Sequence, residues 1–206
     1  MNVYIQYLSE LIPEKDSLKI VRAEAEKYYK SHSIDECYDI TIELYQSENF
    51  QIQEIGVLLL GYVAHQKPEA MGFLKNKVSQ HDSWKVQEIL AMAFDNHCKI
   101  IGYENALPLI REWFSNECAN VRRAVSEGLR IWTSRPYFKE HPDIAVELLA
   151  EHKDDKSEYV RKSIGNALRD ISKKHSDLVS AELSTWDLSL KENTQVHKLA
   201  SKFIQK

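Results

Sequence analysis

The sequence predicts an all-α fold built from repeated helices, and three observations predict it. The 206 residues include only six glycines and five prolines, roughly half of average usage, and this scarcity of turn residues disfavours a many-stranded β fold. Nearly every segment places apolar residues at positions i, i+3, i+4 and i+7, the period of an amphipathic helix. A hydrophobic content of 43% is enough for a sizeable core.

The periodicity predicts helices at about residues 2–12, 16–31, 34–47, 51–66, 68–79, 83–97, 103–116, 119–133, 142–152, 157–174, 176–184 and 192–205. Their ends carry ordinary signals. Ser33 and Glu36 have the spacing of a capping box, and Asp16 and Asp82 are expected as N-caps. Three prolines mark helix starts or stops, namely Pro68, Pro136 and Pro142.

One kind of helix recurs along the chain. Its copies share an apolar anchor, which is Ile52, Val86, Val121, Val160 or Val196. The anchors are 34, 35, 39 and 36 residues apart, and further apolar residues or a glycine follow four and eight positions after each. A near-constant spacing of this size is typical of an α-solenoid of HEAT-like helical repeats. We therefore expect a single curved domain over residues 1–206; the alternative is accidental spacing in a helical bundle.

Composition and missing motifs exclude several classes of protein. The longest apolar run, 55–64, is half of what a bilayer-spanning helix needs, and no basic segment precedes an apolar stretch at the N-terminus. The three cysteines (Cys37, Cys98 and Cys118) form no Cys-x-x-Cys pair, and the histidines show no metal spacing. We expect a soluble protein of the bacterial cytoplasm or nucleoid, without a membrane or metal partner.

Charge is distributed unevenly, although the net charge is only −4. Residues 1–103 carry ten Lys and Arg against fifteen Asp and Glu, and residues 104–206 carry seventeen against sixteen. Seven of the eight arginines lie in the second half. A site for anions is therefore expected in that half.

In a HEAT-like stack the second helix of each repeat lines the inner surface, and equivalent positions form rows across it. The row two residues after the anchors is Glu54, Glu88, Arg123, Lys162 and Lys198. Basic rows of this kind suit an extended polyanion, because Lys and Arg displace counterions from phosphates. The candidate site residues also have plainer interpretations: Trp84 as a packing residue, Arg123 with Glu127 as a surface pair, and Arg122 and Arg161 as solvated charges. Three tryptophans are expected in the core, namely Trp113, Trp132 and Trp186.

Three segments together resemble a known family. They are DSWKVQE at 82–88, NVRRAVSEGLR at 120–130 and YVRKSIGNALRDISKKH at 159–175. The three segments occur in order along the chain and are separated by the repeat spacing. Together they make the sequence similar to the HEAT-like repeat DNA glycosylases of the AlkD/AlkC superfamily over about residues 35–205. The resemblance implies excision of cationic alkylated purines, such as 3-methyladenine and 7-methylguanine, from duplex DNA without metal or cofactor.

The resemblance also implies the site residues. Trp84, Glu88 and Arg123 match the tryptophan, carboxylate and arginine that surround the damaged nucleotide in the AlkD branch, and the AlkC branch adds Glu127 and Asp170. The implied catalytic set is thus Trp84, Glu88, Arg123, Glu127 and Asp170. The expected DNA-binding set is Arg122, Arg123, Arg161, Lys162, Asn166, Lys198 and Lys202. We expect Trp84, Glu88 and Arg123 to share one hollow.

Alkylation at N3 or N7 gives the purine a positive charge, so the enzyme chiefly has to stabilise an oxocarbenium and position water, which a fixed carboxylate can do. Two departures weaken this machinery. Glu88 stands where the family has Asp, and moving a catalytic carboxylate by about 1 Å lowers the reaction rate by orders of magnitude. Asn166 stands where AlkD has a second tryptophan. We expect a monomeric, divergent AlkD paralogue with weak duplex binding through its basic C-terminal half and reduced or lost excision. The alternatives are a non-catalytic nucleic-acid binder and a protein-interaction scaffold.

Overall fold

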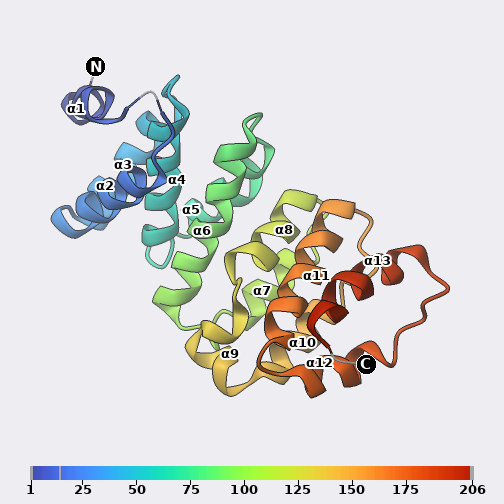
Figure 1. Cartoon of the computed structure of the whole chain (residues 1–206). Coiled ribbons are helices and arrows are strands. Elements are labelled where there is room, and N and C mark those ends of the chain that lie inside the picture. Colours follow the sequence, from blue (N-terminus) through green and yellow to red (C-terminus); the bar gives the residue numbers. More distant parts are fainter. Residues whose placement is uncertain (1, 14, 205–206) are drawn as a thin grey trace. The chain divides into compact units, whose positions relative to one another are not determined.

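The computed structural model describes residues 2–13 and 15–204, and every regular element within those ranges is a helix (Figure 1). The all-α fold of HEAT-like repeats is therefore confirmed. The chain divides into two compact units, Met1–Ile101 and Gly102–Lys206. One continuous domain over 1–206 stays a prediction, and each unit is described by itself.

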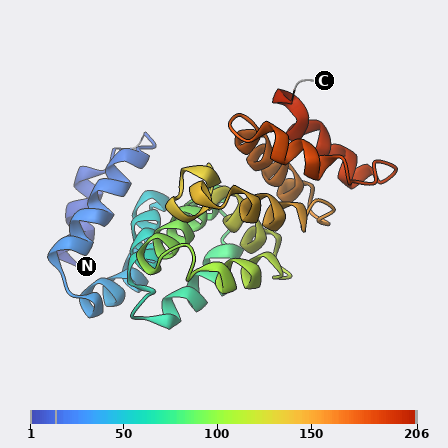
Figure 2. The same cartoon turned by 90° about the horizontal axis from the view of Figure 1, so that it is seen from below.

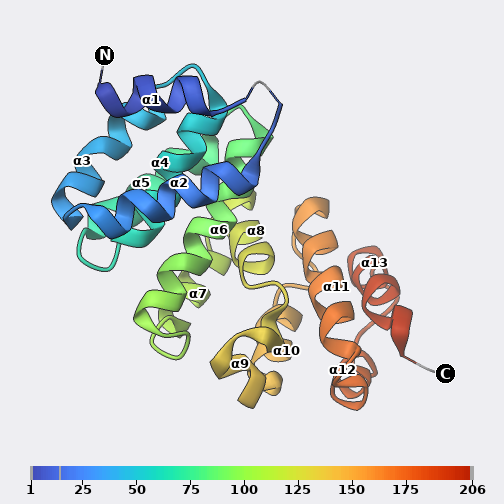
Figure 3. The same cartoon turned by 60° about the vertical axis from the view of Figure 1, so that its left-hand side comes forward.

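The N-terminal unit is organised around its most apolar helix. Its helices are α1 (Val3–Leu11), α2 (Leu18–Ser31), α3 (Ile34–Tyr45), α4 (Phe50–Val63), α5 (Pro68–Asn76), the 3₁₀ turn η1 (Val78–Gln80) and α6 (Trp84–Ile101). Helix α4 packs against α1, α2, α3, α5 and α6 (Figure 3). A side chain at Gly61 would approach the Ala93 Cα to 2.6 Å, so glycine permits the close contact of α4 with α6.

The C-terminal unit is organised around α11. Its elements are α7 (Leu107–Phe114), α8 (Ala119–Gly128), η2 (Trp132–Ser134), α9 (Pro136–Glu140), α10 (Pro142–Ala150), α11 (Glu158–Ser172), α12 (Ser176–Leu183), α13 (Lys191–Ala200) and η3 (Ser201–Phe203). Helix α11 packs against α8, α10, α12 and α13 (Figure 2). The predicted core tryptophans are buried here: Trp113, Trp132 and Trp186.

The five repeat anchors confirm the repeat. Ile52, Val86, Val121, Val160 and Val196 are all completely buried, on α4, α6, α8, α11 and α13. Within the N-terminal unit α4 contacts α6, and within the C-terminal unit α8 contacts α11 and α11 contacts α13. Helices that share the anchor pattern are therefore neighbours within each unit, as the spacing predicts.

Helix ends match the sequence prediction less well than helix centres. The capping box of Ser33 and Glu36 is present, whereas α2 begins after Ser17 and not after Asp16. Helix α13 ends at Ala200 and gives way to η3, short of the expected residue 205. The predicted helices leave out residues 134–141, where α9 begins at Pro136, one of the prolines expected at a helix start or stop. Its five residues are too few to show a helical period.

A second row recurs one residue after each anchor. Four of its members cap the loop before their own helix by donating to the carbonyl six residues earlier. These bonds run from Gln53 to Ser47 (2.8 Å), Gln87 to His81 (2.6 Å), Arg122 to Asn116 (2.7 Å) and Arg161 to Asp155 (2.6 Å). Since each bond ties a loop carbonyl to the helix that follows the loop, this row is part of the fold.

Among the described residues no helix has both the length and the apolar character to cross a bilayer. None of the three cysteines, all within the described residues, forms a disulfide bond; Cys37 and Cys98 are buried and Cys118 is partly exposed.

Candidate nucleic-acid interface

The row two residues after the anchors reaches the surface only in part. Glu54, its first member, is 3% exposed, so its expected place on an inner surface is wrong. Glu88 and Arg123 are partly exposed, and Lys162 and Lys198 are exposed. The exposed members therefore become basic towards the C-terminus.

Burial, together with the nearby Asp16, raises the pKa of Glu54 to about 7, against the lowering effect of Lys85. One of its oxygens, Oε2, is buried without a hydrogen-bond partner. Because the native state favours the protonated form, its contribution to stability is complete below pH about 4.5 and is lost as the pH rises to about 7.

Glu54→Gln, which does not titrate, is therefore expected to unfold like the natural chain at pH 4.5 but to be more stable at pH 8. The expected gain is roughly 3 kcal/mol, since one pKa unit corresponds to about 1.4 kcal/mol and the pKa rises from 4.5 to about 7. Urea unfolding at both pH values measures this difference. An equal difference at the two pH values would contradict a titrating Glu54.

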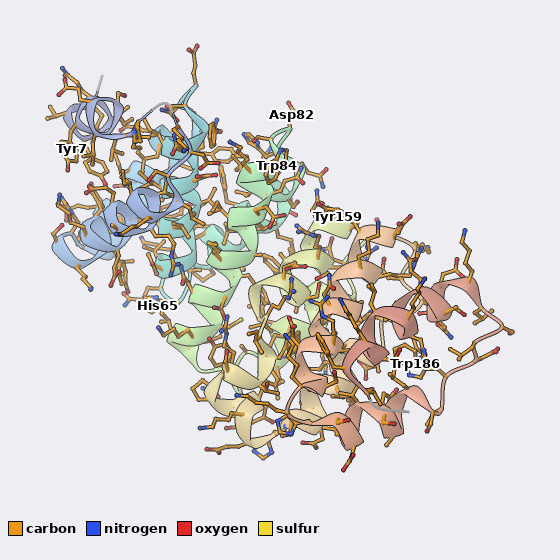
Figure 4. The ribbon with its side chains drawn as sticks, in the orientation of Figure 1. Tyr7, His65, Asp82, Trp84, Tyr159 and Trp186 are labelled. Carbon is orange, nitrogen blue, oxygen red and sulfur yellow. The ribbon has the colours of Figure 1, made fainter. Side chains whose placement is uncertain are left out.

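Trp84 and Glu88 belong to the N-terminal unit. Trp84 is the first residue of α6 and is 66% exposed, and Glu88 follows one helical turn later (Figure 4). An exposed indole at a helix start is not a packing residue, so the plainer interpretation of Trp84 is wrong within this unit. A ring left in solvent is available for stacking on a nucleotide or for CH-π contact with it.

Arg123 and the remaining predicted residues belong to the C-terminal unit. The Arg123 guanidinium carbon lies 4.5 Å from the ring centroid of Tyr159, which is 60% exposed at the start of α11 (Figure 4). This cation-π contact holds the guanidinium of α8 against the neighbouring helix. Sequence reasoning missed Tyr159, although it directly precedes the anchor Val160.

The lysines of the expected DNA-binding set are at the surface. Lys162 forms an exposed i, i+4 pair with Glu158 at 2.7 Å, which contributes little to stability in water. Lys198 is exposed on α13, and Asn166 is partly exposed on α11. Lys202 lies in η3, with its ammonium 5.8 Å from the Phe203 ring. Because α13 ends at Ala200, Lys202 does not continue the helical row of Lys198.

Two arginines of the expected DNA-binding set hold the fold together. Arg122 makes a bidentate ion pair with Asp155, at 2.6 and 2.7 Å, across to the loop before α11. Arg161 is buried and donates to Gln195 on α13 at 2.9 Å. Each arginine also donates through Nη1 to two loop carbonyls. Neither arginine is therefore a solvated charge, and their assignment as DNA-binding residues stays a prediction.

Glu127 and Asp170 are brought together by a residue that sequence reasoning missed. Arg130 donates to Asp170 Oδ2 at 3.0 Å and to Glu127 Oε2 at 3.3 Å. Asp170 is 8% exposed and also accepts from Lys173 at 2.9 Å. Burial raises the pKa of Asp170, but its bonds from Lys173 and Arg130 outweigh burial and lower the pKa overall. The motif offered a signal, since Arg130 lies three residues after Glu127.

The structure thus forms two local groupings in the C-terminal unit. The first is the contact of Arg123 with Tyr159; Lys162 and Lys198 occupy the equivalent repeat positions on α11 and α13. The second is Glu127 with Arg130 and Asp170. Trp84 and Glu88 form a separate pair on α6, and the hollow expected to unite them with Arg123 stays a prediction. Over residues 2–13 and 15–204, no group of three His, Cys, Asp or Glu side chains could hold a metal ion.

The chain belongs to the DNA alkylation repair enzyme family, whose pattern matches residues 17–201. It is similar to AlkD2 from Streptococcus mutans, with 48% identity, a TM-score of 0.93 and coverage of 98% of both chains. It is also similar to smu.31 from Streptococcus mutans UA159, with 50% identity, a TM-score of 0.89 and coverage of 97% and 98%.

Two further comparisons are more distant. The alkylpurine DNA glycosylase AlkC of Pseudomonas fluorescens, solved bound to DNA with an abasic site analog, is 21% identical, with a TM-score of 0.59 over 94% of this chain and 49% of that one. At this identity it shows a shared fold. YhaZ of Bacillus subtilis (strain 168) is 34% identical over 91 residues, which are 42% of this chain, and the chain spans 26% of its length.

Proposed function

We propose that this chain binds duplex DNA through the basic surface of its C-terminal unit and that its excision of alkylated purines is reduced or lost. The observation that carries the proposal is the ion-pair cluster of Glu127, Arg130 and Asp170. Lys173 and Arg130 lower the pKa of Asp170, which makes its carboxylate a weaker base towards water, and Glu127 shares Arg130 with it. Of the carboxylates implied by the family, Glu88 is the one that lies outside this cluster.

Glu88 is a weak substitute for the shorter Asp of the family. The extra methylene displaces the carboxylate by about 1 Å or more, and displacements of this size reduce rates strongly. Asn166 offers no π face where AlkD has its second tryptophan, so a cationic base loses one stabilising wall. Both differences act on catalysis and leave phosphate binding intact.

The surface of α8, α11 and α13 supports DNA binding. Arg123, Lys162 and Lys198 occupy equivalent positions on α8, α11 and α13. Of these helices, α8 contacts α11 and α11 contacts α13. Arginine suits phosphate because its planar guanidinium donates two parallel hydrogen bonds. We propose that these residues each contact a backbone phosphate, with the chain acting as a monomer in the cytoplasm.

A base-release assay on methylated duplex tests the catalytic half of the proposal. We expect the natural chain to release 7-methylguanine at no more than about a tenth of the rate of a glycosylase measured alongside, and we expect Glu88→Ala to abolish any release. Glu127→Gln and Asp170→Asn should leave the rate per folded molecule unchanged. Release as fast as that of the comparison enzyme, or its loss in Asp170→Asn, would overturn this half.

A further inference from the structure

The N-terminal unit contains a cavity that the proposed function does not use. Its volume is about 480 Å³, within the usual range for small-molecule sites. It lies between α1 and α2 and is lined by Tyr4 and Tyr7 of α1 and by Glu24, Lys27 and Tyr28 of α2, among others (Figure 4 labels Tyr7). Three tyrosines and a carboxylate in one cavity suggest a definite ligand chemistry.

The aromatic side chains form a continuous row. The ring centroids of Tyr7 and Tyr4 are 6.1 Å apart, those of Tyr4 and Tyr28 are 4.5 Å apart, and those of Tyr28 and His32 are 3.8 Å apart with nearly parallel planes. The faces of aromatic rings carry negative electrostatic potential. Such a row gives the cavity an apolar wall that attracts cations.

Glu24 supplies a counter-charge within this wall. The residue is 8% exposed, and its Oε1 accepts a long hydrogen bond of 3.4 Å from the Tyr7 hydroxyl. Its Oε2 is buried and has no hydrogen-bond partner among the described residues. Burying a carboxylate with one oxygen unsatisfied is unfavourable, and a cation in the cavity offsets that cost.

The chain already places an ammonium at the rim of this cavity. Lys27 Nζ lies 5.2 Å from the Tyr7 ring centroid, 3.3 Å from the Tyr7 hydroxyl and 3.5 Å from Glu24 Oε1. Its side chain is 64% exposed, so the charge remains largely hydrated and does not fill the cavity. A methylated ammonium is larger and less hydrated, and aromatic faces recognise it better than they recognise a primary amine.

We infer that the cavity between α1 and α2 is a binding site for a methylated ammonium group, with Tyr4, Tyr7 and Tyr28 contacting the methyl groups and Glu24 neutralising the charge. Lys27 occupies the rim when the site is empty and moves aside when a ligand binds. The acidic first half of the chain favours a cation electrostatically. The site shares no residue with the basic row of the C-terminal unit, so its test does not depend on the outcome of the DNA-binding test.

Calorimetric titration of the whole chain tests the inference with three probes. Choline and Nε-trimethyl-lysine carry the same trimethylammonium group, the first on a small alcohol and the second on an amino acid. The probe that binds more tightly identifies which kind of molecule supplies the methylated ammonium. The neutral isostere 3,3-dimethylbutan-1-ol has the shape of choline without its charge. We expect saturable binding of at least one cation, about tenfold or more tighter than the isostere. No saturable binding of either cation, or equal binding of the isostere, would overturn the inference.

Variants connect the binding to this cavity. Glu24→Gln and Tyr7→Leu should each weaken cation binding by about tenfold, whereas Lys27→Met should strengthen it by removing the competing ammonium. Phe203→Leu is the matched control, because Phe203 is an exposed ring with lysines over it and lines no part of this cavity. Tyr7 is itself 39% exposed, so its variant is expected to fold even if Glu24→Gln does not. Unchanged binding in Tyr7→Leu, or weaker binding in Lys27→Met, would contradict the assignment.

Discussion

Replacing Arg122 by Ala is expected to lower the free energy of unfolding by about 3–5 kcal/mol, the usual result of removing one partner from a buried ion pair. The Arg122 side chain is largely buried against Asp155, which is almost completely buried. The substitution leaves the Asp155 carboxylate without its bidentate partner and leaves the carbonyls of Asn116 and Glu117 without a donor from this side chain. Urea unfolding measures the change.

Arg111 provides the matched control for Arg122. It also pairs with two carboxylates, Glu147 and Glu151, but all three side chains are about half exposed. Solvent-exposed pairs contribute about 1 kcal/mol or less, so Arg111→Ala should be nearly neutral. If the two alanine variants lost similar stability, Arg122 would not have the structural role assigned to it.

Asp170→Asn is expected to lower the free energy of unfolding by about 2–4 kcal/mol at pH 7, because Arg130 and Lys173 lose their shared anion. The ionised carboxylate is favoured in the native state, so its contribution is present at neutral pH and is lost as the pH falls below about 3.8. The stability gap between the natural chain and Asp170→Asn should therefore shrink in acid. Unfolding curves at pH 7 and pH 3 measure this.

Glu127→Gln tests whether the effect belongs to Asp170. Glu127 is more exposed and bonds Arg130 at the longer distance of 3.3 Å, so its variant should lose about 1 kcal/mol or less. A gap for Asp170→Asn that stayed constant or widened towards pH 3 would show that the carboxylate is not held ionised by its neighbours.

The sequence predicted the repeats well because burial imposes a pattern. Each anchor must face the core of a stacked pair, and all five anchors are completely buried. Helix ends were predicted less well, since a helix can stop wherever a turn satisfies its last carbonyls. Helix α13 therefore ends at Ala200, although apolar periodicity continues to Ile204.

The roles of the charged residues were harder to predict. Arg122 and Arg123 are adjacent and identical in type, yet one is paired with a buried aspartate and the other lies on an exposed tyrosine. The difference depends on Asp155 and Tyr159, more than thirty residues further along the chain. Helical periodicity shows on which face of its helix a residue lies, but it does not show which side chain from a distant part of the sequence contacts that residue.

The salt dependence of duplex DNA affinity tests the central claim most directly. Each phosphate contact contributes about 0.9 to the slope of log affinity against log salt concentration. If Arg123, Lys162 and Lys198 each contact a phosphate, replacing all three by Ala should reduce the slope by about 3 and weaken binding to all duplex sequences alike. A salt-independent affinity for the natural chain, or an unchanged slope in the triple variant, would contradict the account.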